Sequence, residues 1–335
     1  MHGTPLIRAL REAIPDSRVV LAGSGFGYQT HRFHPLLERV VETPNPIHNL
    51  WGAIAALRRV DLFRDESFAV LTPNGSQRTL VALQAFLAVR AARIGFTEAP
   101  ELYRAVLHYD PTLSQIENNL RLVPLLSHPL PKSAGEPEVF FTESDKTRAS
   151  SLLQQHGIDL ERPVVVFVTQ TSPTQQKGWS VDRFREIARW MRARWHVQVV
   201  LVGTAQEADA IDELRGGLSF ATANLAGATN LTTLCALLSL CDVGLTLDTG
   251  TLHLGRAVGL PMVILAPAWS PVREWLPIDN PRFMVLKKGT LPSQPANYRI
   301  DEVSVSDVQA AMERLLDRFP PLTRQGRRGL VHVPS

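Results

Sequence analysis

One segment of the sequence, LTLDTGTLHLGRAVGLP, joins an apolar run to a helical pattern through residues that suit a phosphate or a hydroxyl-bearing ligand. It carries, in order, Asp248, Thr249, Gly250, Thr251 and His253. The backbone N–H groups of Thr249, Gly250 and Thr251 would point outward at the helix start and attract an anion. Asp248 would then either cap the helix or accept a hydrogen bond from a ligand hydroxyl. An ordinary strand-to-helix turn, with a capping aspartate and a structural histidine, fits the same spacing.

A second polar segment, VTQTSPTQQKGWSVDRF, also follows an apolar run and leads into a helical pattern. Its hydroxyl groups and its single ammonium group would complete a phosphate site, with the lysine acting as a point charge. The alternative is a solvated loop in which the lysine extends into water and Trp179 packs against the helix start. The polar residues concerned are Thr169, Thr171, Ser172, Thr174 and Lys177.

The elements around these segments alternate between strands and helices, which predicts an α/β fold with parallel sheets covered by helices on both faces. The strand-like runs of the second half are PVVVFVT, VQVVLVG, DVGLTLD and PMVILAP, with helical patterns between them. Both polar segments directly follow such a run. Ligands of doubly wound sheets bind beyond the carboxyl ends of the strands, so we expect the two segments to share one site there.

The first half shows the same alternation. TPLIRALREAIP predicts a helix, RVVLAG a strand, HPLLERVVETP a helix running into a strand, and SQRTLVALQAFLAVRAA a helix capped by Ser76. No clear helix is predicted directly after the glycine run of GSGFGYQTHRFH. Prolines crowd into residues 109–137, around a helix predicted near 113–122. We therefore expect two Rossmann-like domains, 1–137 and 138–335, that are joined by a proline-rich linker and face each other.

The composition is that of an ordinary globular protein, and a length of 335 residues favours two domains. A net charge of +3 is too small to indicate a nucleic-acid partner. Cys235 and Cys241 are expected to be buried thiols in a reducing compartment, and no metal site is expected. We find neither a signal peptide nor an apolar run of membrane-spanning length. The expected location is the cytoplasm, with peripheral association to a membrane left open.

Together the two polar segments resemble those of lipopolysaccharide heptosyltransferases, glycosyltransferase family 9. The pattern K-G-W-x-x-x-x-F is followed by D-T-G-T-L-H-L-x-x-A-x-G-L-P. VVLVG, NLAGATNLTTLCALLSLCDVGL and VSVSDVQAAMERLL run in the same order as in that family. At the other end, TPLIRALREAIPDSRVVLAG is similar to the family's first helix and second strand. The resemblance covers most of the chain and is strong from Pro163 to Pro267.

This resemblance implies a two-domain glycosyltransferase B fold and an inverting transfer that needs neither a metal nor a cofactor. The C-terminal domain would bind a nucleotide-sugar donor, ADP-heptose in the best-known members. The N-terminal domain would face a lipid A–core acceptor at the cytoplasmic face of the inner membrane. Lys177 would contact the donor phosphates. The other donor-site residues that the resemblance implies are Asp248, Thr249, Gly250 and His253, with Thr171 and Ser172 near the family's hydroxyl pair, which Pro173 interrupts here.

The front of the chain departs from that family. In the family a first strand precedes the first helix and ends in a Gly-Asp turn, whose aspartate is proposed as the general base toward the acceptor hydroxyl. Here the chain begins MHGTPLIRAL, at the start of that helix. We expect the first strand to lie upstream of the recorded start, and a degenerate family member is the alternative. The catalytic residue is therefore left unassigned.

Two further groups of residues are weaker candidates. His31 and His34 follow the glycine run and would have to replace the expected base. The segment WSPVREWLP brings Trp269, Arg273 and Trp275 together after the last main strand. These residues would contact the nucleotide or the sugar, or would pack the domain.

The leading hypothesis is an inverting, metal-independent glycosyltransferase that moves a heptose from ADP-heptose to a lipopolysaccharide core or a related cell-envelope glycolipid. One alternative is a catalytically inactive protein that binds a nucleotide-sugar but lacks the base. Another is a transferase, epimerase or hydrolase of the same fold that acts on a different nucleotide-sugar, since fold alone does not fix function.

Overall fold

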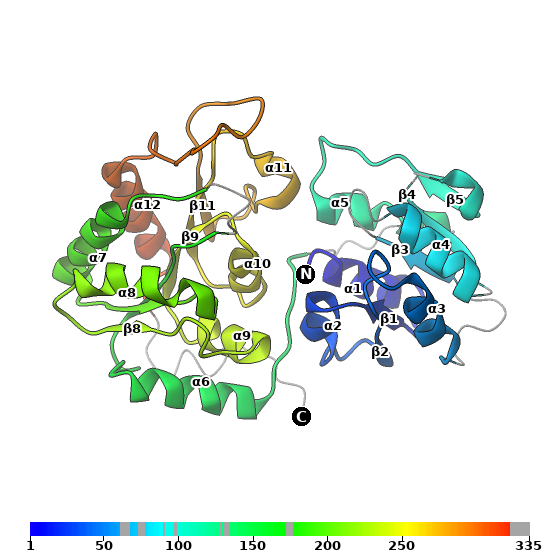
Figure 1. Ribbon diagram of the computed structural model, residues 1–335, viewed down its shortest axis with the longest axis horizontal. Coiled ribbons are helices and arrows are strands. Elements are labelled where there is room, and N and C mark those ends of the chain that lie inside the picture. The colour runs from blue at the N-terminus through cyan, green and yellow to red at the C-terminus, as the bar shows by residue number, and fades with distance from the viewer. Residues whose placement is uncertain are drawn as a thin grey trace. The chain divides into compact units, whose positions relative to one another are not determined.

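A computed structural model shows how these segments are arranged (Figure 1). It describes residues 1–60, 68–72, 78–89, 91–96, 99–126, 129, 135–171 and 177–321. The chain divides into two compact units, Met1–Phe140 and Phe141–Ser335. Each unit combines helices with strands, and every strand pairing among the described residues is parallel. The predicted class, α/β with parallel sheets, is confirmed.

The sheet of the second unit has six strands in the order β11-β10-β9-β6-β7-β8. The chain starts at a central strand, builds outward on one side through β7 and β8, and then returns to the other side at β9. This reversal places the carboxyl ends of β6 and β9 next to each other, with Val168 paired to Thr246. Connections diverge to opposite faces at such a switch point and leave a crevice, which is the usual ligand site of these sheets. The strands are β6 (Val164–Val168), β7 (Gln198–Leu201), β8 (Thr222–Asn224), β9 (Val243–Leu247), β10 (Met262–Leu265) and β11 (Phe283–Leu286).

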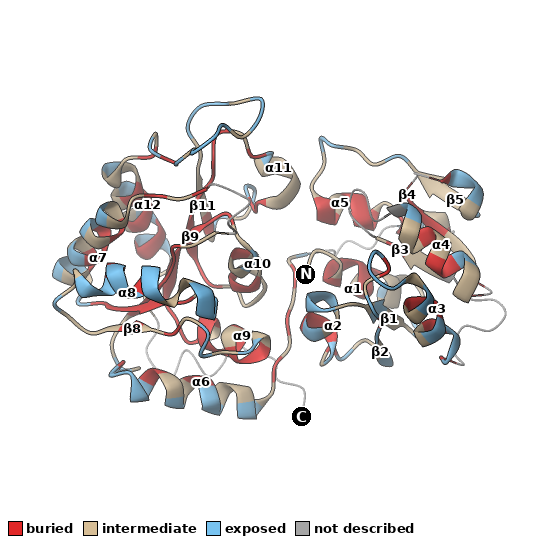
Figure 2. Ribbon diagram, viewed as in Figure 1, coloured by how far each residue is buried: buried red, intermediate tan, exposed pale blue. Residues whose placement is uncertain are grey.

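Helices cover both faces of this sheet (Figure 2). On one face α7 contacts α8 and α12, and on the other α9 contacts α6 and α10. Every residue of the two central strands, β6 and β9, is buried, which explains why both are unbroken apolar runs in the sequence. The helices are α6 (Glu143–Gln155), α7 (Val181–Trp195), α8 (Ala208–Gly216), α9 (Leu231–Ser239), α10 (Gly250–Ala257), α11 (Val272–Trp275) and α12 (Val305–Arg318), with a 3₁₀ turn, η4 (Ala205–Glu207), before α8.

The first unit has, among its described residues, a two-stranded sheet and a three-stranded sheet. The strands are β1 (Val20–Gly23) and β2 (Arg39–Glu42) in one sheet, and β3 (Phe68–Leu71), β4 (Ala92–Phe96) and β5 (Ala105–Leu107) in the other. The helices are α1 (Thr4–Ala13), α2 (Phe26–His31), α3 (Leu50–Arg58), α4 (Arg78–Ala88) and α5 (Gln115–Leu120), with 3₁₀ turns η2 (Pro100–Leu102) and η3 (Val123–Leu126). The helix that packs on α1 is α5, from the proline-rich stretch.

Two predictions for the first unit are wrong. HPLLERVVETP does not begin as a helix but as a turn that leads into β2. Its apolar spacing fits a helix, but the few residues left before β2 are too short to nucleate one. Conversely, α2 does form directly after the glycine run. Gly25, with φ of +48°, turns the chain into that helix, a conformation that glycine adopts without strain.

Several elements were not predicted from the sequence. The longest of them, α6, begins with a capping box in which Thr142 Oγ1 accepts a hydrogen bond from the N–H of Asp145 at 3.1 Å. Its apolar stripe is thin, with Ala149 and Leu153 as its buried residues. The short elements β5, β11 and α11 were also missed. Ser76, the predicted cap of α4, lies outside the described residues.

Other details of the second unit agree with the sequence patterns. Asn230 caps α9, with Oδ1 accepting from the N–H of Thr233 at 2.8 Å. Ser304 starts α12 in a capping box. Cys235 and Cys241 are buried and not joined in a disulfide, as predicted. Within the described residues, no helix combines the length and the apolar character that crossing a bilayer requires.

Trp179 anchors the segment that leads into α7. It is 3% exposed, its Nε1 donates to the carbonyl of Val303 at 2.9 Å, and its ring meets Phe184 edge-on at 5.0 Å. Next to it, the carbonyl of Gly178 accepts from the N–H of Ile300 at 2.9 Å. The residue before this pinned stretch is Lys177, so its backbone position depends on the same contacts.

We therefore predict that Trp179→Ala costs about 3–5 kcal/mol of unfolding free energy, because a buried aromatic ring is lost. Trp179→Phe should cost about 1–2 kcal/mol, since it keeps most of the ring contacts but loses the indole hydrogen bond to the Val303 carbonyl, which then keeps only the one from Arg183 at 3.1 Å. Urea unfolding measures both changes. Trp51→Phe, at a position that is 75% exposed, is the matched control and should change stability little. A Trp179→Ala protein as stable as the control would contradict this role.

Candidate functional site

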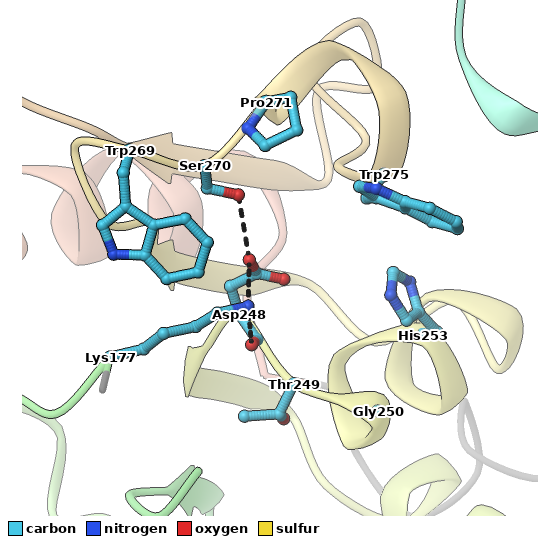
Figure 3. Close-up of a pocket in the computed structure, with 9 residues that line it drawn as sticks. All are labelled: Lys177, Asp248, Thr249, Gly250, His253, Trp269, Ser270, Pro271 and Trp275. Carbon is cyan, nitrogen blue, oxygen red and sulfur yellow. Dashed lines mark hydrogen bonds and ion pairs between the residues drawn. The ribbon is translucent and has the colours of Figure 1, made fainter. Parts of the chain in front are cut away.

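A cavity of about 270 Å³ opens at the carboxyl end of β9 (Figure 3). Three parts of the chain form its wall: Lys177, the turn from β9 into α10, and the segment that runs from the end of β10 into α11. The structure thus brings together the two polar segments of the sequence and adds a third. The lining residues are Lys177, Asp248, Thr249, Gly250, His253, Trp269, Ser270, Pro271 and Trp275.

Lys177 and Asp248 form a buried ion pair in the cavity wall. Nζ of Lys177 donates to Oδ2 of Asp248 at 2.8 Å and to its backbone oxygen at 3.2 Å. The two residues are 6% and 9% exposed. Charges so far removed from water persist beside an opposite charge and further hydrogen bonds. The alternative interpretation of Lys177 as a solvated surface lysine is therefore wrong.

Two residues from the loop after β10, Ser270 and Trp269, also contact this pair. Oγ of Ser270 donates to Oδ2 of Asp248 at 3.1 Å. The ammonium of Lys177 lies 5.2 Å from the centroid of the Trp269 ring, within the range of a cation–π interaction. Within the described ranges, the ammonium makes two hydrogen bonds, both to Asp248, and a third N–H group can therefore meet a ligand.

The start of α10 is open toward an anion. Thr249 is the N-cap residue, and its side chain makes no capping hydrogen bond. Its Oγ1 is buried and has no hydrogen-bond partner among the described residues. The first turn carries no acidic residue. Because Asp248 is held by Lys177 and Ser270, it does not cap this helix, and the positive helix end remains available to a phosphate.

His253 lies in the first turns of α10 and faces the cavity (Figure 3). Burial lowers its pKa from 6.5 to about 4, and the nearby carboxylate of Asp248 opposes this shift only in part. At neutral pH the ring is therefore uncharged. It offers a hydrogen bond to a ligand rather than a positive charge.

The other predicted donor-site residues either do not line the cavity or lie outside the described residues. Thr251 belongs to the first turn of α10 but is not among the residues that line the cavity. Thr169 and Thr171 follow β6, the first buried and the second half-buried, and neither lines the cavity. Ser172 and Thr174 lie outside the described residues, so the predicted hydroxyl donors of this loop remain a prediction.

The two candidate histidines of the first unit, His31 and His34, have structural surroundings. Nδ1 of His31 lies 2.7 Å from the carbonyl oxygen of Gly27, and Nδ1 of His34 accepts from the N–H of Leu36 at 3.3 Å. Burial lowers the pKa of both rings to about 4. His34 also packs edge-on against Phe140. These contacts favour a role in the core of the first unit.

Of the predicted loop residues after β10, Trp269 and Trp275 line the cavity. Arg273 instead pairs with Asp279 at 2.6 Å. Ser270, which is 3% exposed and bonded to Asp248, was not predicted from the sequence. The signal that would have found it is its place just after β10, since β10 ends at the same edge of the sheet as β9.

The sequence profile of glycosyltransferase family 9 (heptosyltransferase) matches residues 77–296. The curated lipopolysaccharide heptosyltransferase 2 of Escherichia coli (strain K12) is 29% identical over 146 residues, which are 42% of this chain and 41% of that protein. The matched part thus spans about two fifths of that relative's length.

Two solved structures share the fold. The glycosyl transferase family 9 structure from Veillonella parvula DSM 2008 superimposes with a TM-score of 0.78, at 16% identity, over 95% of this chain and 93% of that chain. The E. coli heptosyltransferase WaaC, solved with ADP, gives a TM-score of 0.69 at 17% identity over 95% and 94% of the two chains. These likenesses establish a glycosyltransferase B fold of two Rossmann-like domains.

The lowered pKa of His253 predicts a pH-dependent stability. Between pH 6.5 and about 4 the unfolded chain binds a proton on this ring that the folded protein excludes, so stability falls as the pH drops through that window. At about pH 5 the loss from this ring should be roughly 2 kcal/mol. His253→Gln removes it.

Urea unfolding at several pH values tests this prediction. The stability difference between wild type and His253→Gln should be constant above pH 6.5 and should shift in favour of the variant below it. His156→Gln, at an exposed histidine of the same unit, is the matched control. A difference for His253→Gln that stays the same down to pH 4.5 would contradict a buried, neutral ring.

Proposed function

The chain belongs to glycosyltransferase family 9, the heptosyltransferase family, and on this premise we propose that it transfers a heptose from ADP-heptose to a lipopolysaccharide core or a related cell-envelope glycolipid. The observation that carries the proposal is the buried pair of Lys177 and Asp248 beside the open start of α10. This arrangement offers positive groups to a diphosphate and an acceptor oxygen to a sugar hydroxyl in a single cavity. The matched family model describes heptosyltransferases rather than epimerases or hydrolases, and this favours the transferase.

The donor would lie with its diphosphate at the start of α10. The first-turn N–H groups and the remaining N–H of Lys177 would donate to the phosphate oxygens, and the orphaned hydroxyl of Thr249 would add a third donor. Support for adenosine diphosphate as the leaving group comes from WaaC, which was solved with ADP. Support for heptose comes from the family and from the heptosyltransferase relative of E. coli.

In the proposed reaction the acceptor hydroxyl attacks the anomeric carbon from the face opposite the diphosphate. The new C–O bond forms as the bond from the anomeric carbon to the phosphate oxygen breaks, so the configuration inverts. A general base takes the hydroxyl proton, and ADP leaves with the bonding electrons. Lys177 and the helix start stabilise the charge that develops on the leaving oxygen, as fixed donors do in a site shielded from water.

In this proposal one unit binds the donor and the other binds the acceptor. Residues 138–335 would form the donor domain, since the cavity and its charged pair lie there. Residues 1–137 would form the acceptor side and would meet a glycolipid at the cytoplasmic face of the inner membrane. The protein itself would be cytoplasmic or peripheral on that membrane.

Calorimetric titration with ADP-heptose tests the donor site. We expect binding by the wild type, and a loss of at least about 30-fold in affinity for Lys177→Ala and for Asp248→Asn, because each change removes a buried charged partner. Asp248→Asn is preferred to alanine since it keeps the volume of the side chain. UDP-glucose, which lacks both adenine and heptose, should bind far more weakly.

Matched controls separate these effects from general charge loss. Lys288→Ala removes an exposed lysine that pairs with Asp307, and Asp212→Ala removes an exposed aspartate that pairs with Arg215. Both should bind ADP-heptose as the wild type does. A folded wild type that fails to bind ADP-heptose would overturn the proposed function.

The proposed independence from metal gives a separate prediction. Transfer of heptose to a lipopolysaccharide-core acceptor should proceed at an unchanged rate in EDTA, because side chains and a helix start hold the diphosphate. Product formation is followed by mass spectrometry with and without added Mg²⁺. A rate that collapses in EDTA and returns with Mg²⁺ would contradict this part of the proposal.

A further inference from the structure

The two oxygens of the Asp248 carboxylate have different surroundings. Oδ2 accepts two hydrogen bonds, from Nζ of Lys177 at 2.8 Å and from Oγ of Ser270 at 3.1 Å. Oδ1 makes no hydrogen bond with the described residues and points toward the space between His253 and Trp275 (Figure 3). One oxygen is therefore held by the protein, and the other is presented to the cavity.

Ser270 is itself held in place on both sides. Its backbone N–H donates to the carbonyl of Pro267 at 3.0 Å, and its own carbonyl accepts from Nζ of Lys287 at 2.9 Å. The residue is 3% exposed, and Pro271 follows it. A carboxylate only accepts hydrogen bonds, so the Ser270 hydroxyl acts as the donor to Asp248.

This second donor matters because the torsion that rotates a carboxylate is soft and close to two-fold. With Lys177 alone, the carboxylate of Asp248 is free to rotate and to offer both oxygens to the ammonium. A hydroxyl aimed at Oδ2 from the other side removes that freedom. We propose that Ser270 is a positioning residue, which fixes Oδ2 of Asp248 so that Oδ1 accepts a hydrogen bond from a hydroxyl of the bound sugar.

The proposal rests on the proposed function. It states that the sugar of the donor lies at the end of the cavity that holds Oδ1 of Asp248. A free carboxylate oxygen repels phosphate and favours a neutral hydroxyl. The uncharged ring of His253 and the indole of Trp275 face the same space, and an indole face suits the C–H groups of a sugar ring. The diphosphate belongs at the other end, where Lys177 and the start of α10 supply positive charge.

Binding of ADP-heptose and of ADP alone, each to the wild type and to Ser270→Ala, tests the proposal. Ser270→Ala should weaken ADP-heptose about 10-fold, which corresponds to about 1.4 kcal/mol. It should change the affinity for ADP less than 2-fold, because ADP lacks the sugar that Oδ1 would contact. Ser270→Thr keeps the hydroxyl and should restore most of the affinity for ADP-heptose.

Ser239→Ala is the matched control, since Oγ of Ser239 donates to the carbonyl of Ala236 within α9, away from the cavity. It should bind both ligands as the wild type does. Equal weakening of ADP and ADP-heptose by Ser270→Ala would mean a general structural role and would overturn the proposal. So would an unchanged affinity for ADP-heptose.

A ligand-free measurement keeps this test separate from the proposed function. Crystal structures of the wild type and of Ser270→Ala should show the Asp248 carboxylate rotated in the variant, with both oxygens toward Lys177. A carboxylate that keeps its orientation without the Ser270 hydroxyl would overturn the positioning role. Failure of the wild type to bind ADP-heptose would instead overturn the proposed function, whatever the orientation of Asp248.

Discussion

The buried contact between the ammonium of Lys177 and the carboxylate of Asp248 sets the conditions for the rest of the site. The two residues are 6% and 9% exposed, so their charged groups lose most of their contact with water. Hydrogen bonds and the opposite charge within the protein must replace it. The partners lie 71 residues apart in the chain, so they meet because β6 and β9 are neighbours in the sheet. The order of the strands is therefore what makes the pair, and with it the cavity, possible.

The same neighbourhood gives the cavity two chemically different ends. At one end, the start of α10 and Lys177 offer N–H donors and positive charge. At the other end, a carboxylate oxygen, a neutral imidazole and an indole face the same space (Figure 3). An anion fits the first and a hydroxyl-rich, uncharged group fits the second. A nucleotide-sugar carries both features on one molecule, which is why this geometry agrees with membership of a glycosyltransferase family.

Much of the second unit could be predicted from the sequence because its signals are local. Buried parallel strands are unbroken apolar runs, and Asn230, which caps α9, stands directly before an apolar helical pattern. The first unit was harder. The turn before β2 carries apolar spacing that fits a helix, and pairing with β1 decided otherwise. The helix α6 has a capping box but a thin apolar stripe, so packing against α9 supports it more than its own pattern does.

The sequence by itself determined which residue types stand at the strand ends, that the sheets are parallel, and that Asp248 and Lys177 each follow a buried strand and precede a helix. Three features depend on the tertiary structure. Lys177 is buried against Asp248, Ser270 joins the pair although it lies 22 residues beyond Asp248 in the chain, and His253 is uncharged. The physical reason is that periodicity and turn chemistry act over a few residues. Burial and hydrogen-bond partners depend instead on strand order and on which loops meet at one edge of the sheet.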